Sequence, residues 1–205
     1  MTLTDEISDH FDHHAPHYDT FWTSYIGERE LRVIRPLIPP NSTVLDYGCG
    51  TGRTTLDLLR RGCQVTAFDI STEMISLAAS EAARQVYSAD FTTDLDELSG
   101  KTWPLVTCIG VLDYYSDPVP LLSKLRCFLA PLSRLIVTVP NAASPLGWMY
   151  AIGSRLHFPV IPRTPAFMSS AASQAGLTVT SLGFAFPATR MLGLTLVIEM
   201  AVKED

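Results

Sequence analysis

The residues most suited to chemistry are three glycines at alternate positions, Gly48, Gly50 and Gly52, which follow the β-branched apolar run Thr43–Tyr47. Glycine lets the chain turn sharply and lets a ligand approach the backbone closely. The next segment has helical spacing, and the free N–H groups of its first turn would face that ligand. Asp69, at the end of the next apolar run, could accept hydrogen bonds from both ribose hydroxyls of a nucleoside. The pattern predicts a nucleoside-binding loop.

Asp46 lies in the strand that leads into the loop, so its carboxylate would sit beside the ligand. A dinucleotide site has the spacing GxGxxG, with backbone donors facing a pyrophosphate, whereas this chain has GxGxG. A carboxylate at this place would repel a pyrophosphate and attract an ammonium group. The pattern therefore favours S-adenosylmethionine, which carries an amine and a cationic sulfonium, and disfavours a nicotinamide dinucleotide.

With these residues the chain resembles the class I S-adenosylmethionine-dependent methyltransferases over roughly residues 8–140. The sequence VLDYGCGTG at residues 44–52 looks like the first motif of that family. The resemblance implies that the methionine half of the cofactor is lined by Asp46, Gly48, Cys49 and Gly50.

The segment after the second predicted strand looks like the second motif of the family, DxSxxM, with Asp69, Ser71 and Met74 at the matching positions. The resemblance implies that Asp69 binds the ribose and that Ile70 and Met74 lie against the adenine. Ser71 also predicts the N-cap of a helix.

The third and fourth motifs complete the resemblance. The sequence SADF at residues 88–91 looks like the third motif, which implies that Asp90 accepts a hydrogen bond from the adenine amine and that Phe91 packs nearby. The fourth motif covers residues 109–115, and the resemblance implies backbone contacts to the cofactor from Ile109 and Gly110.

Two aromatic segments are placed near the acceptor by the same resemblance. The N-terminal sequence FDHHAPHYD looks like the family's lid segment, so Tyr18 is expected to close over the cofactor and Phe11 to pack under the lid. Tyr114 and Tyr115 follow the fourth motif and could orient an acceptor.

Methyl transfer from a sulfonium is an in-line displacement, in which alignment alone can contribute about 7–11 kcal/mol. A general base is needed only when the acceptor must lose a proton, as a phenol does. The candidate bases are His17 and His14, because the lid should close on the acceptor, and Tyr114. Catalysis by proximity alone is the alternative. No metal site is expected, because the crowded lid histidines fit a solvent-facing helix.

The acceptor region is predicted from a shift in composition, since residues 141–198 contain no Asp, Glu or Lys. This segment could be a cap packed on the sheet, an apolar acceptor pocket, or a surface for a homodimer or a partner protein. As a pocket it would take a lipophilic small molecule bearing a carboxylate or phenolate, methylated on oxygen. Residues 140–156 also resemble enzymes that esterify magnesium porphyrin propionates. The substrate candidates are Tyr115, Trp148, Tyr150, Arg155 and Arg163.

The elements that must position these residues alternate between strands and helices, which is typical of an α/β sheet. Strands are predicted at 43–47, 64–69, 85–89, 105–111 and 135–139, with a closing hairpin of 177–183 and 192–203. Helices are predicted at 53–61, from Ser71 and from Pro118. The resemblance implies a Rossmann-like, seven-stranded, mostly parallel sheet with one antiparallel strand near the end and helices on both faces. A single domain would comprise lid helices (1–35), a cofactor core (36–140), an apolar acceptor cap (141–175) and the hairpin (176–205).

Composition limits the function classes. The chain has 205 residues and a net charge of −6, which argues against nucleic-acid binding. No apolar stretch reaches the length of a membrane span, and the four scattered cysteines fit reduced thiols in a cytoplasmic protein. The alternatives are N- or C-methyl transfer to a small metabolite, or cofactor binding without transfer, as in a partner subunit or a cyclase.

Overall fold

A computed structural model of the chain describes residues 3–18, 21–154, 159–187, 189 and 191–203. One seven-stranded sheet runs through it in the order β3-β2-β1-β4-β5-β7-β6. All neighbours pair in parallel except β7, which is antiparallel to both β5 and β6. The predicted fold class, including the one antiparallel strand near the end, is confirmed. The strands are β1 (Thr43–Tyr47), β2 (Gln64–Phe68), β3 (Asp90–Thr92), β4 (Trp103–Cys108), β5 (Leu129–Pro140), β6 (Leu177–Ala185) and β7 (Thr195–Val202).

Helices cover both faces of this sheet, because successive residues of its central strands are buried on opposite faces. Val44 points into a cluster with Leu56 of α3 (Arg53–Arg60), whereas its neighbour Leu45 points into the opposite cluster with Leu122 of α5 (Val119–Cys127). The helices are α1 (Leu3–His14), α2 (Phe21–Ile34), α3 (Arg53–Arg60), α4 (Thr72–Arg84), α5 (Val119–Cys127), α6 (Pro145–Ser154) and α7 (Pro165–Gln174). Short 3-10 turns are η1 (Ala15–His17), η2 (Arg35–Leu37), η3 (Asp96–Leu98) and η4 (Leu112–Tyr114).

The predicted third strand at 85–89 is wrong. The chain leaves α4 through Gln85, which caps the helix, and Val86, whose φ of 62° turns it in a left-handed conformation. Pairing with β2 begins only at Asp90, which lies opposite Thr66. The turn that ends the helix therefore occupies the residues assigned to the strand.

Other predicted boundaries also differ. The fourth strand ends at Cys108 and not at residue 111, because Gly110 has a φ of 69° and its N–H donates to Thr138 Oγ1. The fifth strand is longer than predicted and begins at Leu129, opposite Trp103. The last strand begins at residue 195 and not at 192.

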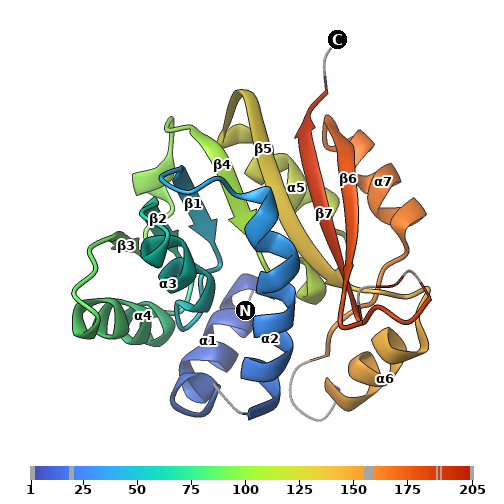
Figure 1. The fold of residues 1–205 in the computed structure, drawn as a ribbon, viewed down its shortest axis with the longest axis horizontal. Helices are drawn as coiled ribbons and strands as arrows, with labels where there is room; N and C mark the ends of the chain where they lie inside the picture. Colours follow the sequence, from blue (N-terminus) through green and yellow to red (C-terminus); the bar gives the residue numbers. More distant parts are fainter. Residues whose placement is uncertain (1–2, 19–20, 155–158, 188, 190, 204–205) are drawn as a thin grey trace.

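The strands that carry the predicted motifs end at one edge of the sheet. Tyr47 pairs with Phe68, so the loops after β1 and β2 leave at the same level. Figure 1 shows α1, the lower part of α2 and α6 at the edge to which the β1 and β4 arrowheads point. Ligands of open α/β sheets bind at this edge. Within the described ranges, no helix combines the length and apolarity that crossing a bilayer requires.

Candidate cofactor and acceptor site

The glycine loop is held by hydrogen bonds to the neighbouring strand. The N–H groups of Gly48 and Cys49 both donate to the carbonyl of Phe68, at 2.7 and 3.0 Å. Gly48 and Gly50 have φ values of 75° and 55°, which explains why glycine occupies both positions. A Cβ at Gly48 would overlap Val111, whereas a Cβ at Gly50 would meet open space.

Asp69 links this loop to the start of α4. Its carboxylate accepts from the Gly50 N–H at 2.8 Å and from the Ser71 N–H at 3.0 Å. Burial raises the pKa of Asp69, while these backbone donors lower it. Ser71 caps α4 as predicted, since its Oγ accepts from the Met74 N–H at 3.1 Å. The carboxylate lies at the pocket wall, where it can accept hydrogen bonds from hydroxyl groups of a ligand.

The lid helix α1 is fastened across the second motif. Ser8 Oγ donates to the carbonyl of Ile70 at 3.0 Å. Asp12 Oδ1 accepts from Ser71 Oγ at 2.5 Å and from the Glu73 N–H at 3.2 Å, so it adds to the cap of α4. These contacts bring Ile7 of α1 onto the pocket.

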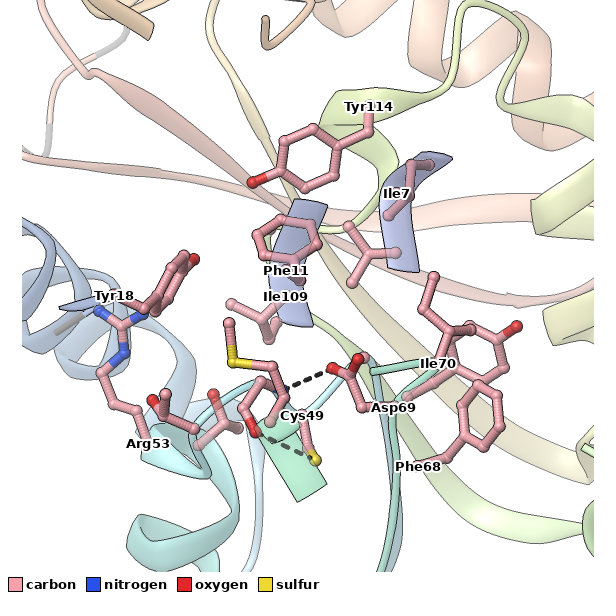
Figure 2. A pocket seen from close by; sticks show the side chains of 18 of the residues that line it. Ile7, Phe11, Tyr18, Cys49, Arg53, Phe68, Asp69, Ile70, Ile109 and Tyr114 are labelled. Carbon is pink, nitrogen blue, oxygen red and sulfur yellow. Dashed lines mark hydrogen bonds between the residues drawn. The ribbon is translucent and has the colours of Figure 1, made fainter. Parts of the chain in front are cut away.

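An aromatic group closes the side of the pocket opposite the glycine loop. The Phe11 ring makes edge contacts with Tyr18 at 5.9 Å and with Tyr114 at 5.3 Å between ring centroids. Figure 2 shows Phe11 and Tyr114 on one side of the pocket and Asp69 and Cys49 on the other. Burial strongly raises the pKa of Tyr114. These three rings form the part of the pocket wall that faces the glycine loop.

Most residues predicted to bind the cofactor line this one pocket. Tyr114 and Tyr115 also belong to its wall. The predicted residues that it brings together are Tyr18, Gly48, Cys49, Gly50, Asp69, Ile70, Met74, Ile109, Gly110, Tyr114 and Tyr115.

Asp46 lies beneath the loop and not at the pocket wall. Only 1% of its surface is exposed, and its carboxylate accepts from Thr55 Oγ1 at 2.6 Å and from Thr107 Oγ1 at 2.8 Å. Burial raises its pKa to about 6. Asp90 and Phe91 lie on β3, outside the pocket wall, with Asp90 exposed.

The lid histidines predicted as bases lie on the solvent side of their helices. His14 and His17 are exposed, and the His14 ring bonds the His10 carbonyl through Nδ1 at 2.8 Å. The His14 and His10 rings are stacked, with centroids 4.2 Å apart. This placement gives no support to a base role for either residue.

The predicted substrate residues of the C-terminal third are not gathered at the pocket. Arg163 donates to the carbonyls of Tyr115 and Ser116, each at 2.7 Å, and its guanidinium lies 4.7 Å from the centre of the Phe167 ring. Trp148 is half exposed and donates to a backbone carbonyl of its own segment. Tyr150 is partly buried on α6, and Arg155 lies outside the described residues.

Sequence reasoning missed several residues of the pocket wall. Arg53 begins α3 directly after the glycine loop, and that position was a signal that its side chain could face the ligand. The others lie in the glycine loop, on α3, at or after strand ends, or on the lid, where only the folded arrangement shows which side chains face the pocket. The missed residues are Ile7, Tyr47, Thr51, Arg53, Thr54, Phe68 and Val111.

Solved structures of similar fold include a methyltransferase and a second protein in complex with SAH. The magnesium protoporphyrin IX methyltransferase of Synechocystis PCC 6803 with bound SAH is 19% identical, with a TM-score of 0.73 that covers 99% of this chain and 100% of that one. The DhpI–SAH complex is 18% identical, with a TM-score of 0.74, and the match covers 99% and 98% of the two chains. At these identities the likeness concerns the fold.

The relatives found by sequence comparison are also methyltransferases. The ubiquinone biosynthesis O-methyltransferase of Xanthomonas axonopodis pv. citri (strain 306) is 25% identical over 70% of this chain and 65% of that enzyme. The enzyme of the same name from Aeromonas salmonicida (strain A449) is 26% identical over 68% and 64%. The chain thus spans less than two thirds of these relatives. The model of the family described as "Methyltransferase domain" matches residues 13–182. The chain therefore belongs to the methyltransferase-domain family, and its fold is that of the class I S-adenosylmethionine-dependent methyltransferases.

Proposed function

We propose that the pocket between the glycine loop and the aromatic lid binds S-adenosylmethionine and that the chain transfers its methyl group to a lipophilic small molecule, on oxygen. The observation that carries the proposal is the Asp69 carboxylate, buried at the wall of a pocket whose loop has φ values that favour glycine. The open space beside Gly50 fits a ligand that packs on the backbone.

The chain's residues would mainly bind and align. Asp69 would accept the ribose hydroxyls, and Ile70 and Met74 offer an apolar surface to the adenine. Bound S-adenosylmethionine supplies an already activated methyl group, so alignment and exclusion of water can provide much of the rate. The rings of Phe11, Tyr18 and Tyr114 would exclude that water.

Oxygen as the methylated atom is supported by the relatives, two of which are named O-methyltransferases. A lipophilic acceptor is supported by the aromatic rings of Phe11, Tyr18 and Tyr114, which line the pocket. A cytoplasmic location is supported by the four cysteines, which are all free and mostly buried. N- or C-methyl transfer, or cofactor binding without transfer, would leave the same cofactor pocket.

The test is release of S-adenosylhomocysteine by purified protein with a neutral catechol, an aromatic carboxylate and an aromatic amine as acceptors. Turnover of the catechol or the carboxylate supports O-methyl transfer. Turnover of the amine alone would contradict it, and tight cofactor binding with no turnover of any acceptor would favour a binder without transfer.

A further inference from the structure

Helix α6 carries large apolar side chains on its outer face. Trp148, Met149 and Ile152 are each at least 50% exposed. Residues three and four apart are neighbours on a helix, so these side chains form one stripe. The buried residues of α6 are instead the small ones, Gly147 and Ala151. A surface helix normally buries its large apolar side chains and exposes polar ones, so α6 has the reverse arrangement.

The small residues let α6 pack closely on the end of the sheet. A Cβ at Gly147 would overlap the backbone carbonyl of Asn141, which follows β5. The Trp148 indole N–H donates to the carbonyl of Ala142 at 2.9 Å. The polar group of this indole is thus bonded within the chain, and its ring can enter an apolar medium without losing a hydrogen bond. The outer face of α6 is therefore fixed by the fold, and the helix contains no charged residue.

The loop between β6 and β7 lies beside α6. The Asn141 side-chain amide donates to the Gly193 carbonyl at 3.0 Å, and its backbone N–H donates to the Leu194 carbonyl at 2.8 Å. These bonds join the loop to the segment that leads into α6, and Figure 1 shows the turn between β6 and β7 next to that helix. Two further apolar side chains of the loop are exposed, Met191 and Leu192. The apolar patch defined here consists of Trp148, Met149, Ile152, Met191 and Leu192.

The charged residues that flank the apolar patch are arginines. Residues 141–198 contain three arginines and no Asp, Glu or Lys, so all 21 acidic residues of the chain lie outside this segment. The Ala142 N–H donates to the Arg163 carbonyl at 2.9 Å, which holds Arg163 beside the start of α6. Where the chain leaves β6, the Arg29 guanidinium of α2 lies 5.2 Å from the centre of the Phe186 ring. The patch is therefore bordered by positive charge.

Neither of these two arginines is neutralised by an ion pair. Arg29 donates to the Tyr25 hydroxyl at 2.7 Å, and Arg163 donates to two backbone carbonyls. The carboxylates that sense the charge of Arg163 are Asp113 and Asp117. Within the described ranges, no carboxylate lies within ion-pair distance of either guanidinium. Both positive charges are therefore available to an anionic group outside the chain.

We propose that the apolar patch docks the chain on the surface of a membrane that contains anionic lipids. Exposed Trp and aliphatic side chains next to arginines are typical of segments that lie at a lipid–water interface. Arginines close to such a surface are attracted by lipid phosphates. The net charge of −6 does not prevent this, because salt screens charges beyond about 8 Å and the groups nearest the membrane decide the interaction.

A second copy of the chain is the other occupant to which an apolar patch could bind. In a two-fold dimer the same surface meets itself. The arginines of residues 141–198 would then meet arginines, and the segment has no Asp or Glu to pair with them. The charge around the patch therefore favours lipid phosphates over a second copy.

The segment after α6 connects the patch with the pocket. The Ile161 N–H donates to the Asp113 carbonyl at 2.8 Å, and Arg163 donates to the Tyr115 carbonyl. Both acceptors belong to the region of η4, where Tyr114 and Tyr115 line the pocket. Docking on the patch would bring this edge of the sheet to the bilayer. The inference goes beyond the proposed function and does not depend on it.

The test is flotation of the purified chain with vesicles of phosphatidylcholine, alone or mixed with an equal part of phosphatidylglycerol. Met149→Glu/Ile152→Glu puts two carboxylates on the patch at exposed positions. Val86→Glu/Leu132→Glu is the matched control, because it makes the same change of charge at two exposed apolar positions, after α4 and in β5. We expect wild type and control to float with the mixed vesicles, and the patch variant to bind them more weakly by roughly 10-fold or more. Melting temperatures near that of wild type would show that both variants fold.

Salt and lipid composition test the role of charge. Raising the salt from about 0.1 M to 1 M shortens the Debye length from about 10 Å to 3 Å, so wild type should bind the mixed vesicles more weakly. Equal binding to the two kinds of vesicle, or equal flotation of the patch variant and its control, would overturn the inference. So would a wild type that floats with neither, including one that is a dimer in light scattering and becomes a monomer in the patch variant. The vesicles contain no S-adenosylmethionine, so failure here leaves the proposed methyl transfer standing.

Discussion

Replacement of Gly50 by alanine tests how closely the cofactor approaches the glycine loop. Gly50 lines the pocket with a φ of 55°, and an added Cβ would meet no atom within 4 Å. The methyl group would therefore stand in the space that we assign to the cofactor, without disturbing the protein around it.

Two separate costs follow from this geometry. Holding alanine in the left-handed region costs about 1–2 kcal/mol of unfolding free energy. Forcing the cofactor off the loop by one methyl group should cost a further 1–3 kcal/mol of binding, by analogy with overpacking, or about 5- to 150-fold in the dissociation constant. The first cost appears in urea denaturation and the second in calorimetric titration with S-adenosylhomocysteine.

Gly100→Ala separates the two costs. Gly100 has a φ of 71° and equally open space at its Cβ, but it lies after η3, outside the pocket wall. Both variants should lose similar stability, and only Gly50→Ala should lose affinity. Equal affinity in the two variants would refute the placement of the cofactor against Gly50.

Three further variants probe the lid, the lid–loop contact and the buried acid below the loop. Asp12→Ala removes the carboxylate that accepts hydrogen bonds from Ser71 Oγ and the Glu73 N–H, so the affinity for S-adenosylhomocysteine should fall roughly 10-fold. Asp9→Ala, on the same helix, should bind with nearly the affinity of wild type. Equal affinities of the two variants would contradict the lid assignment. Gly27→Ala puts a Cβ where the Arg53 guanidinium lies, so calorimetry should show weaker cofactor binding. The melting temperature should stay the same or rise, because alanine favours the helix. Unchanged affinity would exclude a role for the position of Arg53. The Asp46 pKa of about 6 lies above its unfolded value, so the folded state binds the proton more tightly and wild type should lose about 3 kcal/mol of unfolding free energy as the pH rises from about 4 to 6. Urea denaturation of Asp46→Asn should lack that share of the slope, and an identical slope would refute it.

The glycine loop and the strands around it could be predicted because their signals are local. The run Thr43–Tyr47 and the cap at Ser71 are readable from neighbouring residues, and the structure has both as predicted. The prediction of the third strand was wrong because Val86 adopts a left-handed conformation, and no glycine in the sequence indicates a turn there.

The site around the loop depends more on contacts between distant segments. Sequence placed Asp46 beside the ligand, yet Thr55 and Thr107 hold its carboxylate beneath the loop. The lid likewise reaches the pocket only when Ser8 and Asp12 of α1 bond to Ile70 and Ser71. Neither spacing nor composition carries that information.

Calorimetric titration with S-adenosylhomocysteine, comparing wild type with Asp69→Asn and using NADH as the control ligand, tests the central assignment most directly. Asp69 would make charge-assisted hydrogen bonds to the ribose, so its neutralisation should weaken binding by about 3 kcal/mol, or roughly 100-fold. We expect micromolar binding of S-adenosylhomocysteine by wild type, that loss in the variant, and no binding of NADH. Equal affinity in the two proteins, or NADH bound as tightly as S-adenosylhomocysteine, would contradict it.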